Sequence, residues 1–452
     1  MKSTLINNTI VMAIGNFATK LINLILVPLY ANWLLPEEYG NYDLISSVII
    51  FVAPILSLQL EQAVFRFVYE NKENEKVIVT QCINLVIILL LSVYCIMGFL
   101  RKFTSYYTLF FGYISCLCLF SILKEYIRGI GKIKEYVLFS LQNVMQVLLL
   151  SFVFVKPSQD KVGSILFVQV SSYLILIIII LIKEKPYDYK YIKLDKNLLK
   201  ELLKFSIPLI PNTISFWIIN LSDRLLITYY LGSYSNGIYA VACKVPTMIS
   251  MLNSAFVLAW QQEAIGLIKN NDIQKVKTIF LNVIKFIFSI LFITTIISPL
   301  IFRLFISKKY DAAVSLVPIL LTGTAFLCIA QFFNGILVAK MKTLSVGVST
   351  TIGAIINILI NVELLKEFGV VIAAVSTLVS YFVLFIIRII QEKTLAEKKC
   401  IILIVVGTVI EVILAYATFR LKTIGLVLLL FAICVSLFWL NKKHIIKKKS
   451  EI

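Results

Sequence analysis

The chain has 452 residues, of which 60% are hydrophobic and only 15% are charged. Soluble domains have about 45 to 50% apolar residues, so this composition excludes a soluble fold. There are 43 Lys and Arg against 24 Asp and Glu, a formal net charge of +19. Basic residues at the headgroups of a membrane account for this charge without a nucleic-acid partner.

Hydrophobic stretches of membrane-spanning length recur along the chain. About 20 apolar residues cross roughly 30 Å of hydrocarbon. We therefore predict an all-α polytopic membrane protein with about fourteen transmembrane helices. The predicted spans are 9–31, 41–63, 77–99, 105–123, 136–155, 162–182, 206–230, 237–260, 278–302, 313–338, 344–365, 369–391, 400–419 and 423–440.

The distribution of Lys and Arg predicts the orientation. With the N-terminus inside, the cytoplasmic loops and tails hold about three times as many basic residues as the outer loops. Both termini are then cytoplasmic, and the basic tail after residue 440 suits an anionic leaflet. The first span lacks a small-x-small cleavage pattern, so we expect a membrane helix there and not a signal peptide.

An internal repeat predicts how the spans are grouped. A shift of 197 residues places Gly40-Asn41-Tyr42 on Gly237-Ile238-Tyr239, and Ser172-Tyr173 resembles Ser380-Tyr381 at a slightly larger shift. A polar connection between the halves has leucines at helical spacing, which predicts an amphipathic helix on the cytoplasmic surface. The predicted domains are an N-terminal six-helix bundle over 1–183, the amphipathic linker over 184–205, a second six-helix bundle over 206–393, and two extra transmembrane helices with the basic tail over 394–452.

The sequence offers little for catalysis or metal binding. The single histidine, His444, lies in the basic tail, and the eight cysteines show no CxxC spacing. The glycines around Lys132 lack the spacing of a phosphate-binding loop. We expect no metal and no cofactor, and a transporter driven by a gradient or by its substrate, not an enzyme.

Polar residues inside the spans point to transport, because a charge there costs roughly 2.5 to 3.5 kcal/mol. Two stripes at helical spacing run along the first and seventh spans. Packing between helices is the alternative role for the asparagines. The candidate substrate-binding residues are Asn16, Lys20, Asn23, Trp217, Asn220, Arg224 and Lys244.

The deep carboxylates are the candidates for ion coupling. Asp223 is next to Arg224 and points elsewhere on the helix, so we expect Asp223 to pair with Lys244. Lys20 and Arg224 would then be cations without a counter-ion in a water-filled cavity, which suits a phosphate-bearing substrate. Glu411 lies outside both bundles and is either structural or a proton site. Arg388, near a cytoplasmic end, is expected to be a solvated anchor.

Several short runs carry a family resemblance. They are Glu38-Tyr39-Gly40-Asn41-Tyr42, Ser222-Asp223-Arg224 with Leu231-Gly232, Gly237-Ile238-Tyr239 with Lys244, Tyr310 through Pro318-Ile319-Leu320, and Asn357 and Asn361 before Phe368-Gly369. Their order resembles that of the Wzx-type polysaccharide-repeat flippases, within the MATE-like superfamily of oligosaccharidyl-lipid and polysaccharide exporters. The family supplies no fixed catalytic residue.

The resemblance implies two bundles around a cationic cavity with alternating access. It implies a substrate, an oligosaccharide linked through pyrophosphate to undecaprenol, that is moved from the cytoplasmic to the outer leaflet of the bacterial inner (plasma) membrane. The product would serve lipopolysaccharide O-antigen, capsule or exopolysaccharide synthesis. The implied partners are this lipid-linked oligosaccharide, membrane lipids, a polysaccharide polymerase and a chain-length regulator.

Rival functions remain open at this point. A MATE-like drug or cation antiporter would favour an acidic cavity, whereas the deep charges here favour cations. A membrane-embedded polymerase or glycosyltransferase would need a larger outer catalytic loop. Composition does not separate a polysaccharide flippase from a flippase of peptidoglycan lipid precursors.

Overall fold

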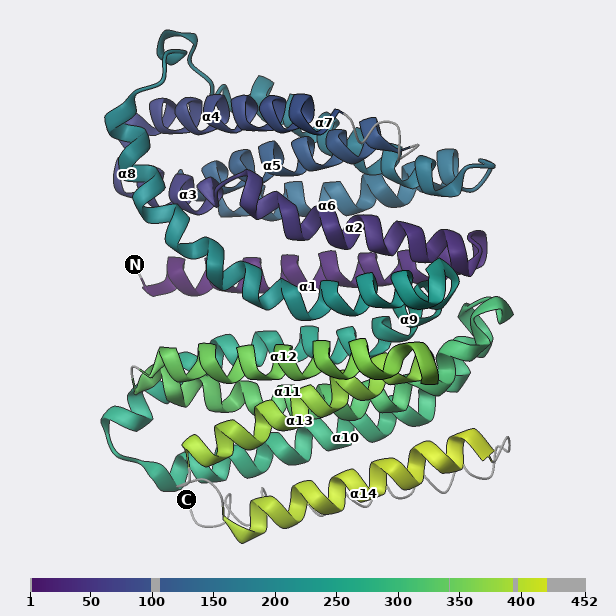
Figure 1. The fold of residues 1–452 in the computed structure, drawn as a ribbon. Coiled ribbons are helices and arrows are strands. Elements are labelled where there is room, and N and C mark those ends of the chain that lie inside the picture. The colour runs from purple at the N-terminus through teal and green to yellow at the C-terminus, as the bar shows by residue number, and fades with distance from the viewer. Residues whose placement is uncertain (1, 99–105, 341, 393–396, 421–452) are drawn as a thin grey trace. The chain divides into compact units, whose positions relative to one another are not determined.

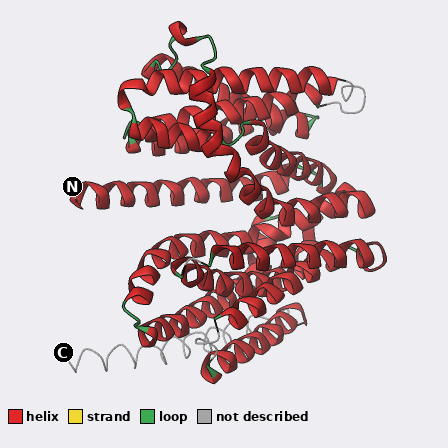
Figure 2. Ribbon diagram, turned by 60° about the vertical axis from the view of Figure 1, so that its left-hand side comes forward, coloured by secondary structure: helices red, strands yellow, loops and turns green. Residues whose placement is uncertain are grey.

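The computed structural model describes residues 2–98, 106–340, 342–392 and 397–420. This part of the chain forms helices and contains no strand, which confirms the predicted all-α membrane class (Figures 1 and 2). It divides into two compact units, Met1–Arg224 and Leu225–Ile452. Each unit is described by itself.

The first unit contains eight labelled helices and the start of a ninth. Their bounds are α1 (Lys2–Trp33), α2 (Pro36–Leu56), α3 (Leu60–Glu70), α4 (Glu75–Ile96), α5 (Tyr107–Gly129), α6 (Ile133–Leu150), α7 (Lys161–Glu184), α8 (Lys196–Ser206) and the first part of α9 (Ile210–Lys269). Short helical turns lie at Lys72–Asn74, Ser151–Val155, Tyr189–Tyr191 and Ile207–Leu209.

The second unit begins inside α9, which is two helices joined at Gly232, where φ is 83°. A glycine suits this position because residues with a Cβ rarely adopt positive φ. The remaining elements are α10 (Ile273–Phe305), a turn at Lys308–Tyr310, α11 (Asp311–Ala339), α12 (Thr343–Phe368), α13 (Val371–Gln391) and α14 (Lys398–Arg420).

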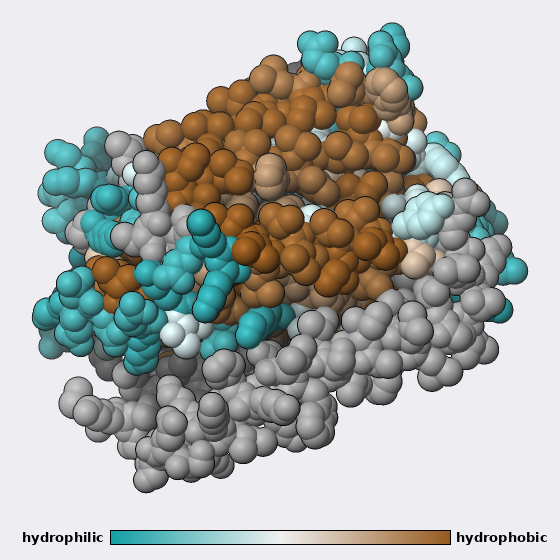
Figure 3. Space-filling view, turned by 90° about the horizontal axis from the view of Figure 1, so that it is seen from below, coloured by the Kyte–Doolittle hydropathy of each residue, from teal (hydrophilic) through white to brown (hydrophobic). Residues whose placement is uncertain are grey.

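The helices bear out the prediction of a multi-pass membrane protein. The described residues of each predicted span before residue 420 are mostly helical, and the last span, 423–440, lies outside the described residues. Among the described residues, ten helices are long and apolar enough to cross a membrane. On the face drawn in Figure 3, hydrophobic residues form a broad band and hydrophilic residues gather at its two ends. A band of this kind matches the hydrocarbon layer between two headgroup regions.

One predicted span is wrong at its end. The prediction 41–63 joins two helices, whereas the structure ends α2 at Leu56 and starts α3 at Leu60. Between them Leu58 and Gln59 have positive φ of 51° and 55°. Hydropathy did not reveal this break, because Leu56, Leu58 and Leu60 continue the apolar run across it.

Each unit packs around one central helix. In the first unit α5 contacts α2, α3, α4, α6 and α7, and in the second unit α11 contacts α10, α12, α13 and α14. Close approach also joins α1 to α6: a Cβ added at Gly15 would lie 2.0 Å from a methyl carbon of Val137. Only glycine permits this spacing, as is usual where membrane helices meet closely.

The linker between the halves is anchored to α4. The amide of Gln81 donates to the carbonyl oxygens of Tyr191 and Lys193, both at 2.8 Å, and its oxygen accepts from Asp195 N at 2.9 Å. The amphipathic helix expected here is α8, and its buried leucines, Leu199 and Leu202, face α3 and α4. The apolar side of α8 therefore packs on protein.

We predict that Gln81→Leu detaches this linker. Losing three hydrogen bonds at a buried amide should cost about 1 to 3 kcal/mol. Limited trypsin digestion of the purified protein should then cut faster after Lys190 and Lys193 than in the wild type. Gln62→Leu, at an exposed position of α3, is the matched control. Equal digestion of both variants would contradict the anchoring role.

Candidate functional site

A charged pair inside the first unit joins α2 to the first part of α9. Arg224 Nε donates to Asp43 Oδ2 at 2.6 Å, and the Asp43 side chain is buried. The start of α2 is fixed locally: Pro36 is its first residue and Glu38 accepts from the backbone N–H of Leu35 at 2.7 Å. This capping arrangement places Asp43 two turns inside the helix.

Tyrosines surround the Asp43 end of this pair. Tyr42 makes edge-to-face contacts with Tyr30 and Tyr39, with ring centroids 5.9 and 6.3 Å apart. The hydroxyl of Tyr30 lies 2.8 Å from Ser151 Oγ, which ties α1 to the end of α6. Such aromatic packing excludes water and strengthens the attraction between the paired charges.

The expectation that Arg224 lacks a counter-ion is therefore wrong. Asp43 supplies the carboxylate, and it was missed because it lies near the outer end of the second predicted span, where a solvated side chain is usual. The sequence did hold a signal. Asp43 directly follows the Gly40-Asn41-Tyr42 run that the internal repeat had marked.

The other predicted stripe residues are only partly described. Lys20 is half-buried and Asn23 is exposed on α1, while Asp223 is buried. Lys244 is half-buried and belongs to the second unit, so its pairing with Asp223 stays a prediction. The side chains of Asn16, Trp217 and Asn220 lie outside the described part of the structure.

A further contact links the seventh-span stripe to the break after α2. Gln59 Nε2 donates to Thr213 Oγ1 at 3.2 Å. Gln59 has positive φ and lies in the break between α2 and α3, and its side chain contacts α9 there. Together with the Asp43–Arg224 pair, this contact makes two polar links between the α2 region and the first part of α9.

Arg388 in the second unit corrects another expectation. It was predicted to be a solvated anchor, but its exposure is only 2%. Its guanidinium donates to Ser349 Oγ, Thr350 Oγ1 and Ala330 O at 3.0 to 3.3 Å. These acceptors lie on α11 and α12, so Arg388 ties three helices together. Its chemistry is structural.

Buried amides hold α12 to α13. Asn357 Nδ2 donates to Ser376 Oγ at 3.2 Å, and Ser376 Oγ donates to Asn361 Oδ1 at 3.0 Å. All three residues have no exposed surface. This network is the packing role that asparagines commonly take in membranes.

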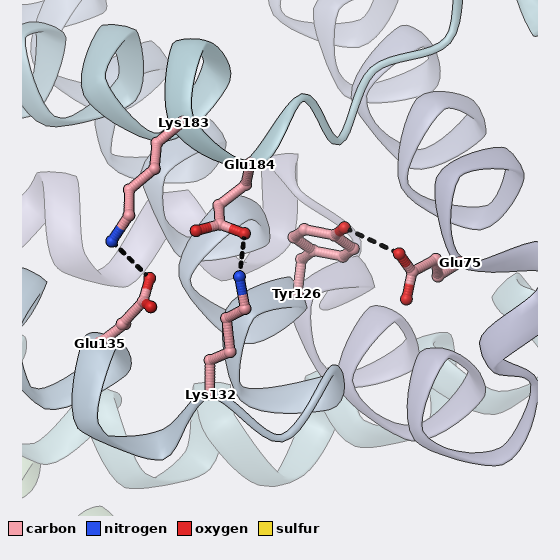
Figure 4. Close-up of polar contacts among 6 residues, drawn as sticks. All are labelled: Glu75, Tyr126, Lys132, Glu135, Lys183 and Glu184. Carbon is pink, nitrogen blue, oxygen red and sulfur yellow. Dashed lines mark hydrogen bonds and ion pairs between the residues drawn. The ribbon is translucent and has the colours of Figure 1, made fainter.

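Charged pairs close one end of the α5, α6 and α7 group (Figure 4). Lys132 pairs with Glu184 at 2.7 Å and Lys183 with Glu135 at 2.9 Å, while Tyr126 donates to Glu75 at 3.2 Å. The hydrogen bond to Glu184 raises the pKa of Lys132. The ammonium group of Lys132 therefore stays protonated at neutral pH.

The second candidate for ion coupling, Glu411, is buried on α14 and accepts a hydrogen bond from Thr295 of α10. Across the described ranges, no cluster of three or more His, Cys, Asp or Glu could hold a metal ion.

The Asp43–Arg224 pair predicts strong thermodynamic coupling. Arg224→Gln or Asp43→Asn alone should each cost about 3 to 5 kcal/mol, because either breaks a buried ion pair. The double variant should cost less than the sum of the two. Thermal unfolding in detergent micelles measures all three.

The exposed pair Arg66 and Glu70, 3.1 Å apart, is the control for this cycle. Its coupling should be only about 0 to 1 kcal/mol. Additive losses for Asp43 and Arg224 would contradict a buried pair.

Comparison with known proteins gives the family. Residues 5–260 match the family described as polysaccharide biosynthesis protein. The chain is also 26% identical over 263 residues to an uncharacterized membrane protein of Methanocaldococcus jannaschii, a match that covers 52% of this chain and spans about half, 50%, of that protein.

Two solved structures share the fold. The lipid II flippase MurJ in an inward closed conformation has a TM-score of 0.76 at 14% identity, covering 97% of this chain and 99% of that one. An inward-facing multidrug resistance MATE family transporter has a TM-score of 0.61 at 14% identity, covering 90% and 96%. The chain therefore belongs to the polysaccharide biosynthesis protein family and has the fold of MurJ and the MATE transporters.

Proposed function

We propose that this protein is a flippase that moves undecaprenyl-pyrophosphate-linked oligosaccharide repeat units from the cytoplasmic to the outer leaflet. Membership of the family and the fold of a lipid-linked substrate flippase support a transporter of this class. The single observation that carries the substrate assignment is the Asp43–Arg224 pair. It holds a guanidinium, the group that binds phosphate with forked hydrogen bonds, inside a membrane bundle.

The proposed cycle begins when the pyrophosphate of the headgroup reaches Lys20 and Arg224, with Lys244 as a third cation. Asn16, Asn23, Asn220 and Trp217 are the proposed contacts for the sugars. The polyprenyl chain stays in hydrocarbon throughout. A polar lumen replaces the water around the headgroup, which could not otherwise cross about 30 Å of hydrocarbon. The bundles then rock and release the headgroup outward.

Asp43 acts in this proposal as a resident anion. It satisfies Arg224 while no substrate is bound, and the pyrophosphate competes with it for the guanidinium. Replacing one anion by another preserves the hydrogen bonds of Arg224, so the arginine never faces hydrocarbon alone. Asp223 and Glu411 are the proposed sites of coupling to a proton or sodium gradient.

The proposed setting is the bacterial inner membrane, with both termini in the cytoplasm, on the basis of the Lys and Arg distribution. The proposed products serve O-antigen, capsule or exopolysaccharide synthesis. A polysaccharide polymerase and a chain-length regulator are the proposed protein partners.

A flippase of peptidoglycan precursors is the second candidate. The likeness to the lipid II flippase MurJ, over 97% of this chain, favours it over a drug antiporter. A lipid-linked precursor of this kind also presents a polyprenyl pyrophosphate, so the proposed cation site serves both substrates. The two candidates differ in the sugars that are attached.

We predict that Lys20→Ala and Arg224→Ala each reduce translocation of a fluorescent undecaprenyl-pyrophosphate oligosaccharide in proteoliposomes. Loss of a charge-assisted hydrogen bond, about 1.5 to 3 kcal/mol, lowers affinity by roughly 10- to 100-fold. Lys156→Ala, at an exposed position, is the control and should transport normally.

The substrate panel decides between the candidates. Transport of the oligosaccharide but not of a peptidoglycan precursor supports the polysaccharide function, and the reverse supports the second candidate. Undiminished transport in both cation variants, at equal protein in the vesicles, would overturn the assigned site.

A further inference from the structure

Helix α14 presents one buried stripe to its neighbours. The stripe recurs at intervals of four and three residues, which is one face of a helix. Helix α14 contacts α10 and α11, while its other faces carry exposed Val and Ile side chains. The members of the stripe are Cys400, Ile404, Gly407, Glu411 and Leu414. A carboxyl therefore occupies the middle of an otherwise apolar helix contact.

The carboxyl of Glu411 is only half satisfied. Glu411 has no exposed surface, and its Oε1 accepts from Thr295 Oγ1 of α10, a residue that is also fully buried. Its Oε2 is buried and has no hydrogen-bond partner. A carboxylate in a protein interior ordinarily accepts several hydrogen bonds or pairs with a cation.

The charged groups of the surrounding helices lie away from Glu411. On α10, Lys285 is ten residues before Thr295 and Arg303 is eight after it, so each is about 12 to 15 Å away along the axis. On α11, Asp311 is at the first residue, and at the start of α14 Glu397 is paired with Lys277 at 2.6 Å. No ion pair to Glu411 occurs among the described residues.

The cationic groups of α14 also lie away from Glu411 along the helix axis. Lys398 and Lys399 are 13 and 12 residues before it and Arg420 is nine residues after it, which is about 14 to 20 Å along the axis. Tyr416, five residues after Glu411, is exposed, and Cys400 is three turns before it. In these surroundings the free-energy penalty of desolvation is large for an ionised carboxylate and much smaller for a neutral carboxyl. We propose that Glu411 is a proton-binding site, whose carboxyl is protonated in this conformation and loses its proton when water reaches Oε2.

The packing makes proton release depend on movement of α14. A Cβ added at Gly407 would lie 2.8 Å from ring carbons of Phe288, so α14 and α10 touch one turn before Glu411. Separation of these helices would open a path for water to Oε2. The carboxyl then passes its proton to water and becomes a carboxylate, and it takes a proton from water before the helices close again.

The first test reads the proton directly and needs no substrate. Infrared spectra of the full chain in lipid vesicles at neutral pH should show a protonated carboxylic acid C=O band that is missing in Glu411→Gln. Glu363→Gln, at an exposed position of α12, should keep the band. Thr295→Val should keep it but move it to higher frequency, because the carbonyl loses a hydrogen bond. Identical spectra for wild type and Glu411→Gln would overturn the proposal.

The second test concerns coupling, and this step rests on the proposed flippase function. In proteoliposomes, a proton gradient should accelerate substrate translocation by the wild type, and in Glu411→Gln the ratio of rates with and without the gradient should fall to one. A gradient response that survives in Glu411→Gln would overturn the coupling role. A protonated band without any translocation by the wild type would instead reject the flippase function and leave the proton site standing.

Discussion

Hydrocarbon offers no hydrogen bonds, and this constraint shapes every polar feature of the protein. An ionisable group inside the bundle therefore needs a counter-ion or enough neutral hydrogen-bond partners, or else it must be neutral. Three described residues illustrate these solutions: Arg224 has Asp43, Arg388 has three neutral oxygens, and Glu411 has a threonine hydroxyl and is the proposed protonated carboxyl. The three solutions differ in how easily the partner can be replaced.

The internal repeat also includes a lysine–glutamate ion pair in each unit. Lys340 pairs with Glu392 at 2.5 Å in the second unit, as Lys132 does with Glu184 at 2.7 Å in the first. Both members of the second pair lie 208 positions after those of the first, the same shift that relates Ser172-Tyr173 to Ser380-Tyr381. In each unit the pair joins the end of the central helix, or the loop that follows it, to the end of the helix packed beside it. The two halves therefore repeat charge placement as well as hydropathy.

Hydropathy predicted the helices well because every helix that crosses the hydrocarbon layer needs about 20 mostly apolar residues. It did not predict the break at Leu58 and Gln59, since the apolar run continues through this turn. Side-chain partners were also beyond reach. Helical spacing placed Arg224 on a stripe, but which distant helix meets that stripe depends on tertiary packing. For the same reason Arg388 was predicted to be a surface anchor: its hydrogen-bond partners are far away in the sequence.

The charge of the partner distinguishes Arg388, which has a structural role, from Arg224, which is the proposed substrate ligand. If Arg388 lost its neutral acceptors, a buried cation between three helices would lack hydrogen bonds, so these acceptors are not exchangeable for a ligand. In the proposed flippase Arg224 differs, because there an anionic headgroup replaces Asp43 as the partner of the guanidinium. This exchange of anions takes place within one bundle, and it preserves the hydrogen bonds of the guanidinium.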